Sequence, residues 1–185
     1  MIVHNFDPVL IDFGIFQLRW YSLAYILGIA IGWIYAIKII KILENNSENF
    51  KSIKKSDFDD LIIYLVLGII LGGRLGYVIF YNLEYYSQNL LEIFKLWQGG
   101  MSFHGGLLGI IIAVLIFSKN RNTNFFKYSD IIACVAPIGL CLGRIANFIN
   151  GELFGKASTL PWSIVFPNGG NIARHPSQIY EAILE

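Results

Sequence analysis

Residues 61–82 read LIIYLVLGIILGGRLGYVIFYN, and this stretch decides the fold. It is apolar almost throughout, and as an α-helix it would be about 33 Å long, enough to cross the hydrocarbon core of a bilayer. Its apolar residues do not alternate with polar ones as they do in the strands of an outer-membrane barrel. The stretch therefore predicts a transmembrane helix, interrupted by one charge, Arg74.

Three more apolar stretches lie outside this one, at about residues 21–43, 101–118 and 131–149. The whole chain is 55% hydrophobic and only 15% charged, with a mean hydropathy of +0.56, which is typical of a bilayer protein. We expect an all-α, polytopic helical bundle in which residues 1–185 form one transmembrane domain. A further helix begins at about Pro176, and its ten residues would reach only about 15 Å. We therefore expect four complete spans, the start of a fifth, and a chain that continues beyond Glu185.

The basic residues predict the orientation of the spans. Eight of the 14 Lys and Arg residues lie in or beside the connections after the first and third spans: Lys38, Lys41, Lys51, Lys54, Lys55, Lys119, Arg121 and Lys127. Because cytoplasmic loops carry an excess of Lys and Arg, this side is expected to be cytoplasmic and the N-terminus outside. The net charge of +1 forms no basic stripe, so no nucleic-acid partner is predicted.

In this orientation, three charged or titratable residues lie at a similar depth in the outer half of the spans. Arg74 would be about 12 Å below the end of its span, His104 about one turn inside, and Arg144 about 9 Å below Asn150. An arginine inside a span is costly unless it is paired or faces water, so both arginines are functional candidates. The alternative is structural: either arginine reaches outward, or pairs with Glu152, only to hold the bundle.

Other polar residues follow Arg144 closely, at the depth of lipid phosphates. Asn147, Asn150 and Glu152 are the nearest of them. Guanidinium groups bind phosphate oxygens in a bidentate manner, so the pattern favours an anionic phospholipid of the outer leaflet as ligand, within a lipid bilayer. His104 is able to move a proton near neutral pH, although a histidine at a helix start is more often a hydrogen-bonded structural group. Glycines four residues apart favour close helix packing.

Five segments together resemble the bacterial prolipoprotein diacylglyceryl transferases. They are RWY (19–21), GGRLGY (72–77), GGMSFHGG (99–106), GRIANFINGELFG (143–155) and RHPSQIYE (174–181). The similarity runs along essentially the whole chain, and the fourth segment is long and specific. It implies further spans beyond Glu185, which carry another functional arginine.

The resemblance implies transfer of the diacylglyceryl group of phosphatidylglycerol to the lipobox cysteine thiol of a prolipoprotein. The reaction would occur at the periplasmic side of the bacterial inner membrane, without metal or other cofactor. By analogy, Arg144 binds the phosphatidylglycerol head group. The other residues that the resemblance places in the active region are Tyr21, His104, Asn147, Glu152 and Gly155.

Chemistry suggests a role for each candidate. His104 would deprotonate the thiol or orient the head group, and Arg144 would neutralise the departing phosphate. Glu152 is expected to fix Arg144 by a charge-assisted bond. The other residues expected to bind the lipid substrate are Asn147, Asn150, Gly155 and Arg74. The two asparagine amides would bind glycerol hydroxyls.

Two rival functions remain open from the sequence. In a membrane anion transporter, Arg74 and Arg144 would line a path, but the inner halves of the spans are nearly all apolar and no internal repeat is present. A non-catalytic, truncated fragment of the enzyme is the second alternative.

Overall fold

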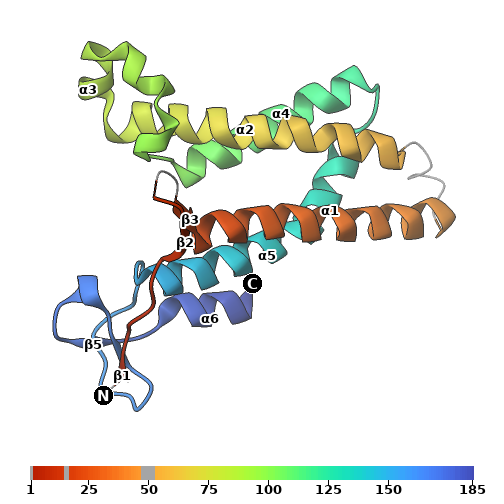
Figure 1. Cartoon of the computed structure of the whole chain (residues 1–185). Helices are drawn as coiled ribbons and strands as arrows, with labels where there is room; N and C mark the ends of the chain where they lie inside the picture. Colours follow the sequence, from red (N-terminus) through yellow and green to blue (C-terminus); the bar gives the residue numbers. More distant parts are fainter. Residues whose placement is uncertain (1, 15–16, 47–52) are drawn as a thin grey trace. The chain divides into compact units, whose positions relative to one another are not determined.

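The computed structural model describes residues 2–14, 17–46 and 53–185 (Figure 1). Over these residues, four helices are long and apolar enough to cross a membrane: α1 (Trp20–Asn46), α2 (Lys55–Tyr81), α4 (Phe103–Asn120) and α5 (Phe125–Asn150). They contain the four predicted spans almost entirely, so a polytopic helical membrane protein is confirmed. Lys51, one of the residues used to predict orientation, lies outside the described residues.

Short elements lie outside the long helices, and only one of them is predicted from the sequence. That one is α6 (Ser177–Leu184), which begins one residue after Pro176. The others include α3 (Leu83–Gln88) and three 3₁₀ turns, η2 (Leu90–Phe94), η3 (Leu96–Gln98) and η4 (Pro167–Gly169). Strands too short to show a period of two make up the rest: β1 (Ile2–Val3), β2 (Val9–Asp12), β3 (Gln17–Arg19), β4 (Ile164–Val165) and β5 (Ala173–Arg174).

The strands form two small sheets. In one, β1 pairs with β4 in parallel and β4 pairs with β5 antiparallel. In the other, β2 and β3 pair antiparallel, and Asp12 at the end of β2 accepts from the Gly14 amide at 2.7 Å and from the Gln17 side chain at 3.0 Å. These two donors, the Gly14 amide first, lower the pKa of the exposed Asp12 carboxyl below its usual value.

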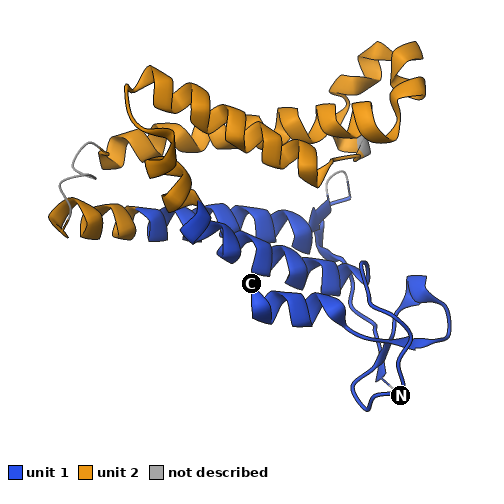
Figure 2. Cartoon of the chain, turned by 180° about the vertical axis from the view of Figure 1, so that it is seen from behind, with its two compact units in different colours: residues 1–36, 133–185 blue, residues 37–132 orange. Residues whose placement is uncertain are grey.

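The chain divides into two compact units, drawn in different colours in Figure 2. The first comprises residues 1–36 and 133–185, and the second comprises residues 37–132. Both α1 and α5 therefore contribute residues to each unit. The prediction that residues 1–185 form a single domain stays a prediction.

In the second unit, α2 and α4 pack together through glycines. A Cβ atom added at Gly68 would lie 2.6 Å from the carbonyl oxygen of Gly109, and one at Gly76 would lie 2.7 Å from the Cα of Gly105. A Cβ atom at Gly72 would overlap the carbonyl oxygen of Gly105 and would lie 2.8 Å from the Cα of Gly109. Only residues without a side chain allow two helix backbones to approach in this way, as the four-residue glycine spacing predicts.

In the first unit, an aromatic cluster covers the end of α5. Phe166 is completely buried, with ring centroids of His4 at 5.2 Å and Phe154 at 5.3 Å from its own. His4 shares a hydrogen bond of 2.6 Å between its Nε2 and the carbonyl oxygen of Phe148, near the C-terminus of α5. The N-terminal strand is thereby attached to the helix end that carries the candidate site.

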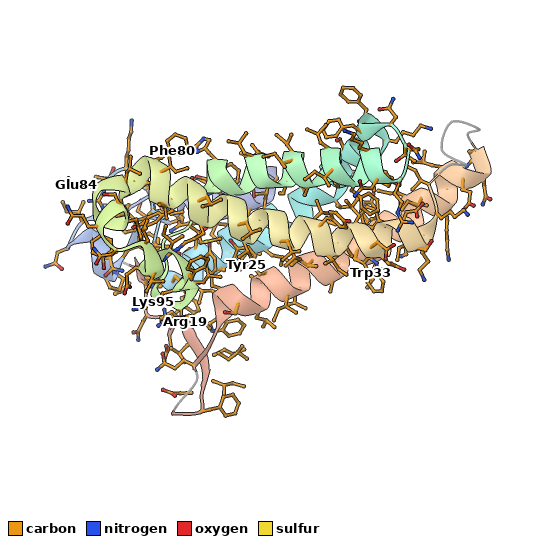
Figure 3. The ribbon with its side chains drawn as sticks, turned by 90° about the horizontal axis from the view of Figure 1, so that it is seen from above. Arg19, Tyr25, Trp33, Phe80, Glu84 and Lys95 are labelled. Atoms are coloured by element: carbon orange, nitrogen blue, oxygen red, sulfur yellow. The ribbon has the colours of Figure 1, made fainter. Side chains whose placement is uncertain are left out.

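Large apolar side chains project outward along the long helices. Tyr25 and Trp33 extend from α1 and Phe80 extends from the last turns of α2 (Figure 3), with exposed fractions of 56%, 36% and 71%. In water such exposure would be costly, whereas lipid tails are as apolar as these side chains. The outward faces of the helices therefore suit a bilayer.

Candidate active site

The end of α5 and the turn after it bring three of the candidate polar residues together. Gly151 has a φ of +66°, which ends the helix and reverses the chain. The Glu152 amide then donates to the carbonyl of Asn147 at 3.1 Å. One carboxylate oxygen of Glu152 accepts hydrogen bonds from both asparagine side chains, at 2.9 Å from Asn147 and 3.3 Å from Asn150. The two amides thus hold the Glu152 carboxylate against the helix end.

Arg144 is not fixed by Glu152, and that expectation is wrong. Its Nε atom lies 2.9 Å from a carboxylate oxygen of Glu181 in α6 and 3.3 Å from one of Glu185, directly after α6. These two glutamates are four residues apart, so both point from the same face of α6. Glu152 is instead committed to the two asparagine amides one to two turns further along the chain.

Both terminal nitrogens of Arg144 remain available. Across residues 2–14, 17–46 and 53–185, no hydrogen bond reaches either of them, and the side chain is 33% exposed. The carboxylates therefore orient the guanidinium by its Nε edge. The two NH₂ groups are left to form the fork that suits a pair of anionic oxygens.

Residues 151–155 are held against residues 174–178 by a series of hydrogen bonds. The Gln178 side chain, completely buried, donates to the carbonyl of Glu152 at 2.5 Å, and the Ser177 hydroxyl donates to the carbonyl of Leu153 at 2.9 Å. The Gly155 amide donates to the carbonyl of His175 at 2.9 Å. A Cβ at Gly155 would lie 3.0 Å from that of His175, so this close approach favours glycine.

Tyr21 lies in the same unit, in the first turn of α1. Its ring centroid is 5.2 Å from that of Tyr25, one turn further along the helix. Six of the predicted site residues thus belong to the unit of residues 1–36 and 133–185: Tyr21, Arg144, Asn147, Asn150, Glu152 and Gly155.

The remaining two, Arg74 and His104, belong to the unit of residues 37–132. His104 is the second residue of α4 and is exposed, with its ring edge-on to that of Phe103 at 5.7 Å between centroids. Arg74 is 3% exposed and donates to backbone carbonyls in the segment between α3 and α4. Its role in substrate binding stays a prediction. To bind a phosphate, Arg74 would have to give up hydrogen bonds to these carbonyls.

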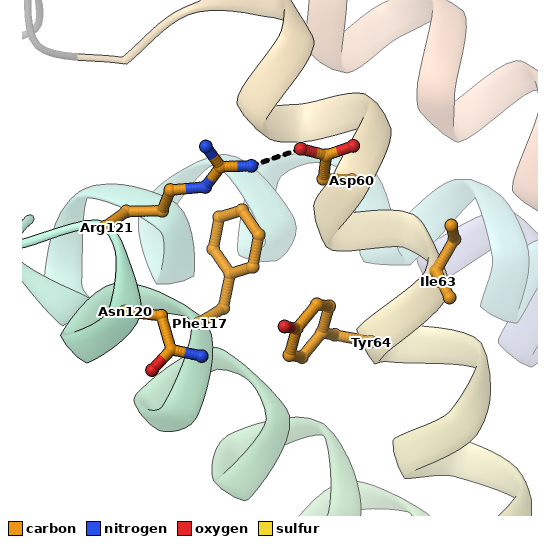
Figure 4. Close-up of a pocket in the computed structure, with 6 residues that line it drawn as sticks. All are labelled: Asp60, Ile63, Tyr64, Phe117, Asn120 and Arg121. Carbon is orange, nitrogen blue, oxygen red and sulfur yellow. Dashed lines mark hydrogen bonds and ion pairs between the residues drawn. The ribbon is translucent and has the colours of Figure 1, made fainter.

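A cavity lies at the other end of α2 and α4, about 21 Å from Arg74 along α2. Figure 4 shows Arg121 paired with Asp60 at its rim, and the Arg121 guanidinium also lies 5.4 Å from the Phe117 ring centroid. No predicted site residue lines it.

In the part of the chain that the structure describes, no three His, Cys, Asp or Glu side chains are grouped to hold a metal ion.

Comparison with known proteins gives the family. The model of the prolipoprotein diacylglyceryl transferase family matches residues 8–185. The chain belongs to this family. It is similar to the phosphatidylglycerol–prolipoprotein diacylglyceryl transferases of Rickettsia canadensis (52% identical over 100% of this chain), Rhodospirillum rubrum (52% over 97%) and Rhodopseudomonas palustris (52% over 97%).

The chain spans about two thirds of the length of these transferases, namely 69%, 64% and 63% respectively. The matched part contains the long helices and both halves of the hydrogen-bonded segment around Glu152. Gln178 and Glu181 were not predicted from the sequence to be site residues, although both lie in the RHPSQIYE motif. Their positions in that motif could have indicated that both residues belong to the site.

Proposed function

We propose that the protein transfers the diacylglyceryl group of phosphatidylglycerol to the thiol of a prolipoprotein's lipobox cysteine. The names of the similar transferases contain both substrates, phosphatidylglycerol and prolipoprotein. The excess of basic residues after α1 and α4 supports an orientation in a bacterial inner membrane with the end of α5 toward the periplasm. A prolipoprotein with its cysteine at the outer membrane surface would then meet the site directly.

One observation carries the proposal: the arrangement of Arg144. Its Nε is held by the carboxylates of Glu181 in α6 and of Glu185 directly after it, while no described residue pairs with its terminal nitrogens. A phosphodiester offers two anionic oxygens with the spacing of this fork. Arg144 thus has the geometry of a phosphate-binding residue that is oriented before the lipid arrives.

The chemistry is a displacement at carbon. The thiol gives its proton to a base, for which His104 is our candidate, and the thiolate forms a C–S bond with the terminal carbon of the diacylglyceryl group. The C–O bond to the phosphate breaks, and its electron pair stays on the oxygen of the departing glycerol phosphate. Arg144 stabilises the charge that develops there.

The remaining candidates support this step. Glu152 and Tyr21 are proposed to act in the active region beside Arg144, with Glu152 held by the Asn147 and Asn150 amides. Because each amide has a second N–H and a carbonyl oxygen, both can still bind a hydroxyl of the glycerol head group. Gly155 is proposed to keep residues 151–155 against residues 174–178.

A lipidation assay tests the proposal. Membranes with wild-type or variant protein are supplied with acyl-labelled phosphatidylglycerol and a lipobox peptide, and thioether product and released glycerol phosphate are quantified. For Arg144→Ala we expect a rate loss of about a hundredfold or more, as for other oxyanion partners. Lys119→Ala removes an exposed cation at the far end of α4 and serves as the control.

Near-normal turnover by Arg144→Ala would overturn the role of Arg144. An unchanged rate in His104→Gln would exclude His104 as the base. Anion flux through proteoliposomes without lipid transfer would instead support the transporter alternative.

A further inference from the structure

We propose that Arg74 is a positioning residue for His104. In this proposal, its buried guanidinium fixes residues 92–100 by their backbone carbonyls, and that segment sets the start of α4. The role of His104 rests on the proposed function. The placement of residues 92–104 by Arg74 does not.

All five N–H groups of Arg74 are used within this one segment. Nε donates to the carbonyl of Ile93 at 2.8 Å. One terminal nitrogen donates to the carbonyls of Glu92 at 2.8 Å and Lys95 at 3.2 Å. The other donates to the carbonyls of Gly99 and, at 3.2 Å, Gly100. A guanidinium has five donors, so none is left for another ligand.

The chemistry of the segment explains why the side chain is an arginine. Two of the five carbonyls, those of Glu92 and Ile93, lie in the last turn of the 3₁₀ helix η2, and the other three, of Lys95, Gly99 and Gly100, lie outside η2 and η3. A delocalised cation with several donors satisfies these carbonyls and is itself stabilised by their partial negative charge. The Tyr86 ring, only 6% exposed, covers the group with its centroid 5.2 Å away. Lysine offers three donors and would leave carbonyls unpaired.

The same turn of α2 also holds the residue that begins α4. The carbonyl of Gly73, next to Arg74, accepts from the Ser102 amide at 2.9 Å. The Ser102 hydroxyl in turn accepts from the Gly105 amide at 3.2 Å and caps α4. His104 is two residues after this cap. Its position is thus set by Gly73 from one side and by the Arg74-bound segment from the other.

The backbone between the Arg74-bound carbonyls and Ser102 has little conformational freedom. Gly99 and Gly100 have φ values of +80° and +83°, which favour glycine. A Cβ at Gly100 would lie 2.5 Å from the Tyr77 ring, so the chain passes directly over α2. A loss of the Arg74 bonds would therefore be transmitted to the start of α4 instead of being absorbed by a loose loop.

Steady-state kinetics of Arg74→Lys in native membranes separate positioning from lipid binding. Because misplacement of a reacting group slows the chemical step, we expect kcat to fall between about tenfold and a hundredfold. The KM for phosphatidylglycerol should stay within about twofold, since no lipid contact is removed. The pH–rate limb that His104→Gln abolishes should also shift. Arg121→Lys, which alters another arginine of the same unit, is the matched control.

A second variant guards against misfolding of Arg74→Lys. A second measurement does not depend on the transfer reaction. Ser102→Ala removes the cap but leaves Arg74 intact, and should reproduce the fall in kcat at constant KM. Hydrogen exchange should accelerate in residues 92–104 of Arg74→Lys and not in α5. This measurement remains valid even if the wild-type protein transfers no lipid, an outcome that would refute only the proposed function.

Two results would overturn the proposal. A rise in KM with kcat unchanged would make Arg74 a lipid-binding residue. Unchanged exchange in residues 92–104 of Arg74→Lys would show that the arginine does not hold the segment.

Discussion

Arg74 and Arg144 show two ways of keeping a guanidinium within a transmembrane helix. Arg74 is surrounded by carbonyls that use every donor. Among the residues that the structure describes, Arg144 is paired only along its Nε edge, by Glu181 and Glu185. The first arrangement fixes a segment of backbone. The second leaves donors for an anion, but its two carboxylates partly neutralise the guanidinium, so they compete electrostatically with an incoming phosphate although they occupy different nitrogens.

This competition gives a prediction for Glu181→Gln. Because an amide does not neutralise the guanidinium, phosphatidylglycerol should bind several times more tightly, with a lower dissociation constant in a detergent-based binding assay. The pair is partly exposed, so protein stability should change by no more than about 1 kcal/mol. Glu84→Gln, on α3, removes a carboxylate without touching Arg144 and is the control. Weaker binding by Glu181→Gln would mean that the carboxylate orients Arg144 without competing.

The sequence identified the buried charges that need partners more easily than it identified those partners. An arginine among apolar residues is recognisable because burial of its charge is costly wherever the fold places it. The partner of such an arginine is harder to predict. Arg144 and Glu181 are far apart in the sequence and meet only because α6 lies beside α5. A glutamate eight residues away, Glu152, was the nearer choice along the chain, but the turn at Gly151 directs it to the asparagines.

Among the elements, the contact between α2 and α4 depends most directly on sequence. Gly109 of α4 faces Gly68 and Gly72 of α2 so closely that a Cβ at Gly68 would be 2.9 Å from the Gly109 carbonyl carbon. Gly106, one turn from Gly109 on the same helix, has room, because the nearest atom to its Cβ would be 3.9 Å away. A side chain would therefore fit at Gly106 but not at Gly109.

We therefore expect Gly109→Ala to destabilise the protein and Gly106→Ala to be tolerated. The added methyl group at residue 109 would push against backbone that cannot rotate away, at a cost of about 1–3 kcal/mol. At residue 106 alanine makes ordinary contact and raises helix propensity. Unfolding in SDS, followed by circular dichroism, measures the difference. Equal loss of stability in both variants would contradict the packing described here.

Helices and strands differed in how well the sequence predicted them. The long helices are evident because a bilayer requires internal hydrogen bonding over a full apolar span. The sheet of β1, β4 and β5 joins residues 2–3 to residues 164–165 and 173–174, and pieces of two residues carry no periodicity. The segment of α3, η2 and η3 escaped prediction for a related reason: its structure depends on Arg74, which lies earlier in the chain.

For the whole molecule, the distribution of basic residues and the position of the candidate site lead to one expectation. The Arg144 end of α5 and the loop of residues 151–176 should face the periplasm, and the connection between α4 and α5 should face the cytoplasm. The proposed reaction requires this orientation, because the lipobox cysteine would be presented at the outer surface. An inverted protein would place Arg144 and Glu152 at the wrong leaflet.

Cysteine labelling of intact cells tests the orientation. In a background in which Cys134 and Cys141 are replaced by alanine, Thr159→Cys should react with a membrane-impermeant maleimide from outside. Lys119→Cys, at the end of α4, should react only after the membrane is permeabilised. Both positions are exposed in the structure, so a difference in labelling reports the side of the membrane and not burial. The reverse pattern would place the N-terminus in the cytoplasm and leave the proposed reaction without access to its protein substrate.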